Sequence, residues 1–282
     1  MSGGISGAFE AARRERRGAL VPFLTSGFPD LAESDRLAAA LCDEGADVIE
    51  LGIPFSDPLA DGPVIQKTTQ IALAAGTTPA HVLGQAMRLR ARFRTPIVLM
   101  SYVNPIHRYG AARFAEDARA AGVDGLILVD LPPEEDAPLW DAISESGLDT
   151  VLMVTPTTDP RRMPAIAARA RGFLYVVARL GVTGRGTADP GLASLFDRCR
   201  AHSPLPRCIG FGMGSSSDFA PLRGRAEGVI VGSELLGALL AETRPASRED
   251  STRSFVRVMK ARLPELWDEG DGGGRNDEGS GD

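Results

Sequence analysis

The sequence has little lysine and histidine, and this scarcity argues against two kinds of aldolase chemistry. Only Lys67 and Lys260 are lysines among 31 lysines and arginines, and neither lies at the end of a predicted strand, where a Schiff-base aldolase needs its lysine. The three histidines, His81, His107 and His202, are far apart in the chain and none falls in a predicted strand. A zinc aldolase needs clustered histidines, so we expect surface or packing roles for all three and no metal site.

Cysteine is also scarce. Cys42, Cys199 and Cys208 include no Cys-x-x-Cys pair, so we expect reduced thiols of a cytoplasmic protein and no disulfide framework. The net charge of -6 offers no basic stripe for nucleic acid, and no run of about 18 apolar residues is present to span a membrane. The N-terminal segment lacks the apolar core of a signal peptide. Nucleic-acid and membrane partners are therefore not expected.

The chain does contain an almost continuous alternation of strand-like and helix-like segments, which is typical of α/β proteins. Eight strands are predicted, at 19–24, 46–53, 96–102, 125–129, 150–154, 172–177, 207–210 and 228–231. Helical patterns are predicted between them, at 35–44, 79–93, 110–121, 134–146 and 160–170. This count favours a closed, eight-stranded parallel (β/α)8 TIM barrel. An open doubly wound sheet is the alternative, and its early glycine-rich turn is missing.

The two ends of the chain differ from this alternating pattern. Extra helices are predicted at 7–17, before the first strand, and at 252–262. No internal linker or repeat is present, so residues 1–269 are predicted to form a single barrel domain. Residues 270–282 are rich in glycine and acidic residues and have too little apolar surface to fold, so a disordered tail is predicted there.

Three carboxylates follow one another closely between residues 49 and 62. Alternation along the strand 46–53 separates Glu50 from the apolar face, and a lone carboxylate in an apolar strand is costly to bury unless it has a partner or a task. Two prolines stiffen the loop that presents Asp57 and Asp61. A strand acid beside a loop acid suits general acid–base catalysis. The alternative is that the two aspartates only cap the helix that begins nearby.

Glycine-rich turns follow the last three predicted strands, at 181–184, 210–214 and 232–233. Barrels of this kind often bind phosphate there, because glycine lets backbone N–H groups approach an anion closely. Ser233 begins a helical pattern and adds a hydroxyl, whereas Glu234 beside it would repel a phosphate unless its side chain points away. The glycine-rich segment 180–191 is predicted to be a lid over the substrate, the alternative being a flexible surface loop.

A Gly-x-Ser-x-Gly elbow and a Walker loop are missing from the sequence. With these classes of enzyme excluded, the sequence favours carboxylate acid–base chemistry on a phosphorylated substrate. Carbon–carbon cleavage without lysine or metal requires a substrate that carries its own electron sink.

The run from Glu50 to Pro63 resembles the signature of the tryptophan synthase alpha chain family, and the likeness extends over roughly residues 5 to 262. Further matching runs are 21–25, 96–100, 125–134, 181–184, 210–212 and 229–233. The resemblance implies a lyase of tryptophan biosynthesis that cleaves indole-3-glycerol phosphate to indole and glyceraldehyde 3-phosphate. It implies no cofactor in this chain, and a beta partner that uses pyridoxal phosphate to join indole to serine. An alpha2-beta2 heterotetramer in the cytoplasm is the expected assembly.

The resemblance also implies roles for individual residues. Glu50 is expected to protonate indole C3 and to accept the proton of the glycerol hydroxyl, while Asp61 holds the indole N–H and stabilises positive charge on the ring nitrogen. The indole ring then serves as the electron sink. The expected substrate-binding residues are Phe23, Met100, Tyr102, Ile127 and Tyr175. The phosphate is expected at Gly184, Gly212, Gly232 and Ser233, with Gly181 and Thr183 in the lid.

Several positions depart from the family pattern without removing a catalytic residue, namely Met100, Ile127, Leu180, Arg185, Gly186, Gly214 and Glu234. They bear on lid closure and on coupling to a beta partner. Three other functions are alternatives. One is a free-standing lyase that releases indole, and another is a catalytically weak barrel that mainly activates a beta partner. The third is a different phosphate-binding barrel enzyme, such as a pentose phosphate isomerase, against which the acidic loop argues. Packing of the barrel core is the alternative for Phe23, Met100, Tyr102 and Ile127.

Overall fold

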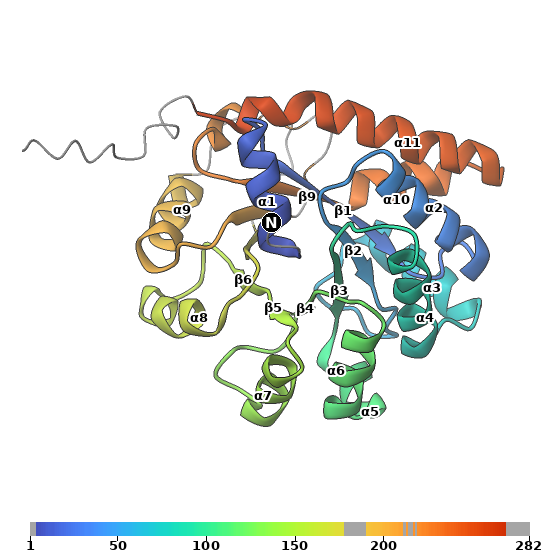
Figure 1. Ribbon diagram of the computed structural model, residues 1–282, viewed down its shortest axis with the longest axis horizontal. Coiled ribbons are helices and arrows are strands. Elements are labelled where there is room, and N and C mark those ends of the chain that lie inside the picture. Colours follow the sequence, from blue (N-terminus) through green and yellow to red (C-terminus); the bar gives the residue numbers. More distant parts are fainter. Residues whose placement is uncertain (1–3, 178–189, 211–212, 214–216, 218, 269–282) are drawn as a thin grey trace, which may run out of the picture.

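A ring of parallel strands surrounded by helices forms the body of the computed structural model (Figure 1). The structure describes residues 4–177, 190–210, 213, 217 and 219–268. In chain order its strands are β1 (Ala19–Thr25), β2 (Ile49–Gly52), β3 (Ile97–Ser101), β4 (Gly125–Leu128), β5 (Asp149–Thr150), β6 (Leu152–Val154), β7 (Leu174–Val177), β8 (Arg207–Gly210) and β9 (Gly228–Val231). Each pairs in parallel with its neighbours, and β9 pairs with β1.

The predicted eight-stranded barrel is confirmed, with one strand position divided in two. β5 pairs with β4 and β6 pairs with β7, and Val151 alone separates β5 from β6. The Val151 N–H still donates to the Leu126 carbonyl at 3.1 Å, which continues the ladder with β4. The predicted strand 150–154 therefore lies in the right place but changes partner in the middle.

Helices alternate with the strands and cover the outside of the ring (Figure 1). Their bounds are α1 (Ile5–Arg14), α2 (Leu31–Asp43), α3 (Pro63–Ala74), α4 (Pro79–Arg90), α5 (Val103–Tyr109), α6 (Ala111–Ala120), α7 (Ala137–Glu145), α8 (Met163–Arg169), α9 (Pro190–His202), α10 (Ser233–Ala241) and α11 (Pro245–Arg262). None of the described helices is long and apolar enough to cross a membrane.

The helices differ from the prediction in three places. Neither α5 nor α9 was anticipated, and α5 contains Pro105, which is tolerated in a first turn although it breaks helix interiors. Helix α11 begins earlier than the predicted residue 252, in a polar segment with little periodicity. There Arg248 pairs with the buried Glu33 of α2 at 2.9 Å, so a tertiary contact supports the first turns.

Alternation along the strands divides the core into two layers. Ile49, Leu51 and Ile53 belong to the outer layer between the strands and the helices. Val48 belongs to the inner layer, together with Val98 of β3. The predicted faces of the strand 46–53 are therefore confirmed, and Glu50 projects toward the barrel interior.

Helix α1 closes the amino-terminal end of the barrel and lies across the centre of the ring in Figure 1. Its buried residues Ile5, Phe9 and Ala12 pack into the inner layer. The Phe9 and Phe173 rings lie 5.6 Å apart, just before β7 begins. This plug leaves the carboxyl-terminal ends of the strands as the open end of the barrel.

Replacing Phe9 with alanine tests the importance of this plug. Phe9 is 5% exposed, so Phe9→Ala leaves a cavity against Phe173 and should lower the free energy of unfolding by about 3–5 kcal/mol. Urea denaturation measures the loss. The matched control is Met87→Ala on α4, because Met87 is 58% exposed. Equal, small losses in both variants would contradict the assignment of α1 as part of the core.

Candidate active site

Glu50 lies in the middle of β2 with its carboxyl group inside the barrel. The residue is fully buried, and neither carboxyl oxygen has a hydrogen-bond partner among the described residues. Burial raises the pKa of Glu50 to about 8, and the nearby Asp61 carboxylate adds to this rise. Glu50 therefore exchanges a proton close to neutral pH, as a general acid–base group must.

Asp61 lies in the loop between β2 and α3 and is partly buried. Burial raises the pKa of Asp61 to about 6, while a hydrogen bond from Tyr102 opposes the rise. Asp57 is exposed and accepts a hydrogen bond from Ser56 at 2.5 Å. The N-cap of α3 is Gly62 and no side chain caps the helix, so the helix-capping alternative is wrong for both aspartates.

A cavity of about 250 Å³ lies at the carboxyl-terminal ends of the strands, and both acids line it. Its wall is largely apolar, which maintains the poor solvation of Glu50. Three of the predicted substrate-binding residues line this cavity, namely Phe23, Met100 and Tyr175. Burial and the charge of Glu50 raise the pKa of Tyr175 well above its usual value, so its hydroxyl stays protonated.

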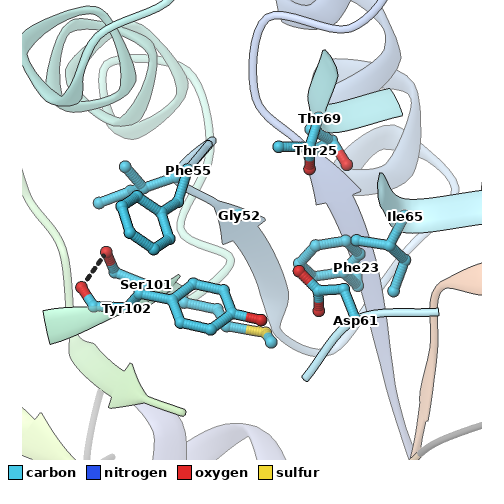
Figure 2. Close-up of a pocket in the computed structure, with 11 residues that line it drawn as sticks. Phe23, Thr25, Gly52, Phe55, Asp61, Ile65, Thr69, Ser101 and Tyr102 are labelled. Atoms are coloured by element: carbon cyan, nitrogen blue, oxygen red, sulfur yellow. Dashed lines mark hydrogen bonds between the residues drawn. The ribbon is translucent and has the colours of Figure 1, made fainter. Parts of the chain in front are cut away.

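The other two predicted substrate-binding residues are not in the wall of this cavity. Tyr102 lines a small adjoining cleft together with Phe55, and this cleft shares Phe23, Asp61 and Met100 with the cavity (Figure 2). Ile127 is fully buried in the inner layer of the core and is not part of the cavity wall. Val129, two positions further along, occupies the wall instead. Met153 and Ile230 also line the cavity and were not predicted, although each lies on the inward face of a strand near its carboxyl end.

Gly232 and Ser233 line the same cavity at the beginning of α10. A β-carbon on residue 232 would lie 3.1 Å from the Phe23 ring, so the lack of a side chain lets backbone and ring approach closely. Unpaired N–H groups at a helix amino terminus attract an anion, which fits the predicted phosphate position. Glu234 is not among the described residues of the cavity wall.

Some predicted positions fall outside the described residues. These are Gly181, Thr183, Gly184 and Gly212 of the lid and phosphate site, the departures Leu180, Arg185, Gly186 and Gly214, and the tail at 270–282.

The histidines have the packing and surface roles that were predicted. His81 takes part in a capping box with Thr78, His107 pairs with Asp136 at 2.8 Å, and His202 contacts the Arg198 carbonyl. The described part of the chain holds no group of three His, Cys, Asp or Glu residues that is suited to a metal ion.

These observations define the class of protein: a (β/α)8 barrel with a buried carboxyl whose pKa is raised to about 8, a second carboxyl beside it, and a helix amino terminus in one apolar cavity.

Comparison with known proteins identifies the family. The family model described as tryptophan synthase alpha chain matches residues 9–263. The tryptophan synthase alpha chain of Geobacter sulfurreducens is 46% identical over 260 residues, which are 92% of this chain and 98% of that protein. The solved tryptophan synthase subunit alpha of Legionella pneumophila has a TM-score of 0.83 at 36% identity, over 93% of this chain and 99% of that one. A solved tryptophan synthase of M. tuberculosis has a TM-score of 0.82 at 32% identity, over 93% and 100%.

The chain therefore belongs to the tryptophan synthase alpha chain family and is a lyase of tryptophan biosynthesis. The resemblance inferred from the acidic loop is confirmed.

The raised pKa of Glu50 predicts how stability depends on pH. The folded protein keeps the Glu50 proton up to about pH 8, whereas the unfolded chain loses it near pH 4.5. Wild-type stability should therefore fall as pH rises through this window. Glu50→Gln removes the ionisable group and with it the cost of a buried charge. The variant should therefore be more stable than wild type above about pH 8, by on the order of a few kcal/mol. Urea denaturation at several pH values measures this difference.

Glu134→Gln is the matched control, because Arg162 lowers the pKa of that exposed carboxyl. Removing the Glu134 charge should destabilise the protein, and this loss should disappear in acid. Glu50→Gln variants that are no more stable than wild type at high pH would contradict the burial of an ionisable Glu50.

Proposed function

We propose that Glu50 and Asp61 divide the catalytic work in cleaving indole-3-glycerol phosphate to indole and glyceraldehyde 3-phosphate. The observation that carries the proposal is the Glu50 carboxyl, which is fully buried, has no hydrogen-bond partner among the described residues and faces the cavity shared with Asp61. A buried group whose pKa is shifted toward neutrality beside an apolar cavity is a strong candidate for proton transfer. Family membership supplies the substrate.

Cleavage requires two proton movements, and Glu50 is placed to make both. The protonated carboxyl first gives its proton to indole C3, which leaves positive charge on the ring nitrogen. The resulting carboxylate then accepts the proton of the glycerol hydroxyl next to the scissile bond. As that bond breaks, its electron pair returns to the ring, and indole and the aldehyde form. Glu50 ends protonated, as it began.

Asp61 is suited to the other role because its environment differs. With a pKa of about 6 it is ionised at neutral pH, where Glu50, with a pKa of about 8, is mostly protonated. An ionised carboxylate accepts a hydrogen bond from the indole N–H and stabilises the positive charge that develops on that nitrogen. When two neighbouring carboxyl groups have different pKa values, the group with the higher pKa can act as the acid and the other as the anion.

The remaining contacts are proposed from the cavity wall and from the family resemblance. Phe23, Met100 and Tyr175 would pack against the indole ring, and Gly232 with Ser233 would hold the phosphate at the amino terminus of α10. The resemblance alone supports Gly184 and Gly212 at the phosphate and Gly181 and Thr183 in a lid.

We further propose that the chain acts with a beta subunit in an alpha2-beta2 heterotetramer. Pyridoxal phosphate would be bound in the beta subunit alone, and no cofactor is proposed for this chain. The family and the M. tuberculosis relative, whose name is that of tryptophan synthase, support a beta partner. The three free thiols, all buried, support a cytoplasmic protein. Residues 1–269 are proposed to form one domain, which a disordered tail at 270–282 follows.

Indole release tests the partnership. The purified chain should cleave indole-3-glycerol phosphate slowly, and an added beta subunit should raise the rate by an order of magnitude or more. Fast turnover that a beta subunit does not change would identify a free-standing lyase. Turnover that stays negligible in the complex, while beta-subunit activity rises, would identify an activator.

Two substitutions test the division of work between the acids. Glu50→Gln should lower kcat by about 10²–10⁴-fold, because amide groups do not transfer protons. Asp61→Asn should lower kcat by roughly 10²-fold, because the amide accepts a hydrogen bond but carries no charge. Asp57→Asn in the same loop is the matched control and should keep wild-type turnover in the isolated chain, since Asp57 is exposed. Equal losses at Asp57 and Asp61 would contradict the assignment.

A further inference from the structure

The loop between β2 and α3 holds Asp61, whose carbonyl accepts a hydrogen bond from the Gln66 side chain of α3 at 2.8 Å. Within the loop, the Leu59 N–H donates to the Asp57 carbonyl and the Asp61 N–H donates to the Pro58 carbonyl, so these bonds shape the turn without attaching it to the barrel. At its start, Ile53 N–H donates to the Met100 carbonyl at 2.8 Å. Close to Asp61, Ala60 N–H donates to the Tyr102 hydroxyl at 2.9 Å.

The Tyr102 hydroxyl lies between the loop backbone and Asp61. Its oxygen accepts the Ala60 N–H at 2.9 Å, which leaves its own proton free to face the Asp61 carboxylate, whose pKa it lowers. Figure 2 shows the hydroxyl pointing from the end of β3 toward Asp61. The Phe55 ring packs on the Tyr102 ring with centroids 5.2 Å apart. Phe55, near the start of the loop, therefore covers the side chain that binds Ala60 near the end of the loop.

Tyr102 is itself held firmly. It is 6% exposed and forms the N-cap of α5. The next residue, Val103, donates its N–H to the Asp130 carboxylate at 2.8 Å, and the Ser101 hydroxyl donates to the Tyr102 carbonyl at 2.8 Å. The phenol therefore extends from a fixed point between β3 and α5.

We infer that Tyr102 is the positioning residue for Asp61: its hydroxyl fixes the loop backbone at Ala60 and aims the Asp61 carboxylate into the cavity. The inference rests on the proposed function of Asp61 and gives Tyr102 a different role from the indole contact expected from the sequence. Tyr102 lines the adjoining cleft, which shares Phe23, Asp61 and Met100 with the large cavity, and its hydroxyl is held by the loop backbone at Ala60.

Tyr102→Phe separates this role from simple packing, because phenylalanine keeps the ring beside Phe55 and removes the hydroxyl that accepts the Ala60 N–H and faces Asp61. Loss of the donated hydrogen bond should raise the pKa of Asp61, so the acid limb of the kcat/KM profile should move to higher pH. The loss of kcat/KM at neutral pH should be roughly tenfold. Other titratable groups face this pair, namely Glu50 of β2, Tyr175 of β7 and Asp130 after β4.

The matched control is Tyr109→Phe, which also removes a tyrosine hydroxyl bonded to an aspartate, here Asp117 at 2.7 Å, at the other end of α5. It should leave the kcat/KM profile and the titration of Asp61 unchanged. Asp61→Ala and the double variant Asp61→Ala/Tyr102→Phe complete a double-mutant cycle. If Tyr102 acts through Asp61, its substitution should cause little further loss once Asp61 is gone.

Titration of the Asp61 carboxyl by ¹³C NMR, with Asp61→Asn used for assignment, tests the inference without substrate. An upward shift in Tyr102→Phe and none in Tyr109→Phe supports it, even if wild-type turnover fails and the proposed function falls. An unchanged Asp61 titration in Tyr102→Phe overturns it, as does a further loss in the double variant equal to that of Tyr102→Phe alone. A variant that loses activity with an unshifted titration marks a packing role, which also overturns it.

Discussion

The site depends on the burial of one carboxyl group, that of Glu50, away from water. Its oxygens lose hydration without gaining hydrogen bonds from the described residues, so the proton is retained up to about pH 8. The two core layers and the α1 plug bury a large apolar surface, which offsets the cost of this one unfavourable position. The stability of the barrel is thus what permits a poorly solvated carboxyl group inside it.

The contrast between the two acids follows from their places in the fold. Glu50 is fixed in the ladder between β1 and β3, where neither its depth nor its solvation changes easily. Asp61 is on a loop, partly open to solvent, and its position depends on what holds that loop. Tyr102 makes this connection from the end of β3, so the geometry of the pair is set by two neighbouring strands and one phenol.

The sequence predicted which way side chains face better than it predicted how deep they lie. Strict alternation along β2 placed Glu50 inside the barrel, and the strand ends placed Gly232 and Ser233 at the cavity. The same alternation put Ile127 on the inward face, yet it lies in the packed core, whereas Val129 lines the cavity. Depth depends on how neighbouring strands are staggered, and the roles of Tyr102 and of the break at Val151 depend on tertiary contacts. A single sequence does not predict the stagger of the strands or these tertiary contacts.

Direct titration of Glu50 tests the central claim most plainly. ¹³C labelling of glutamate carboxyl groups, with Glu50→Gln used to assign the resonance, reports the protonation of this residue in the substrate-free protein. The account predicts a midpoint near pH 8, set by burial. A midpoint in the ordinary range of glutamate, about 4.3, would contradict it, because Glu50 would then be an ordinary ionised carboxylate at neutral pH.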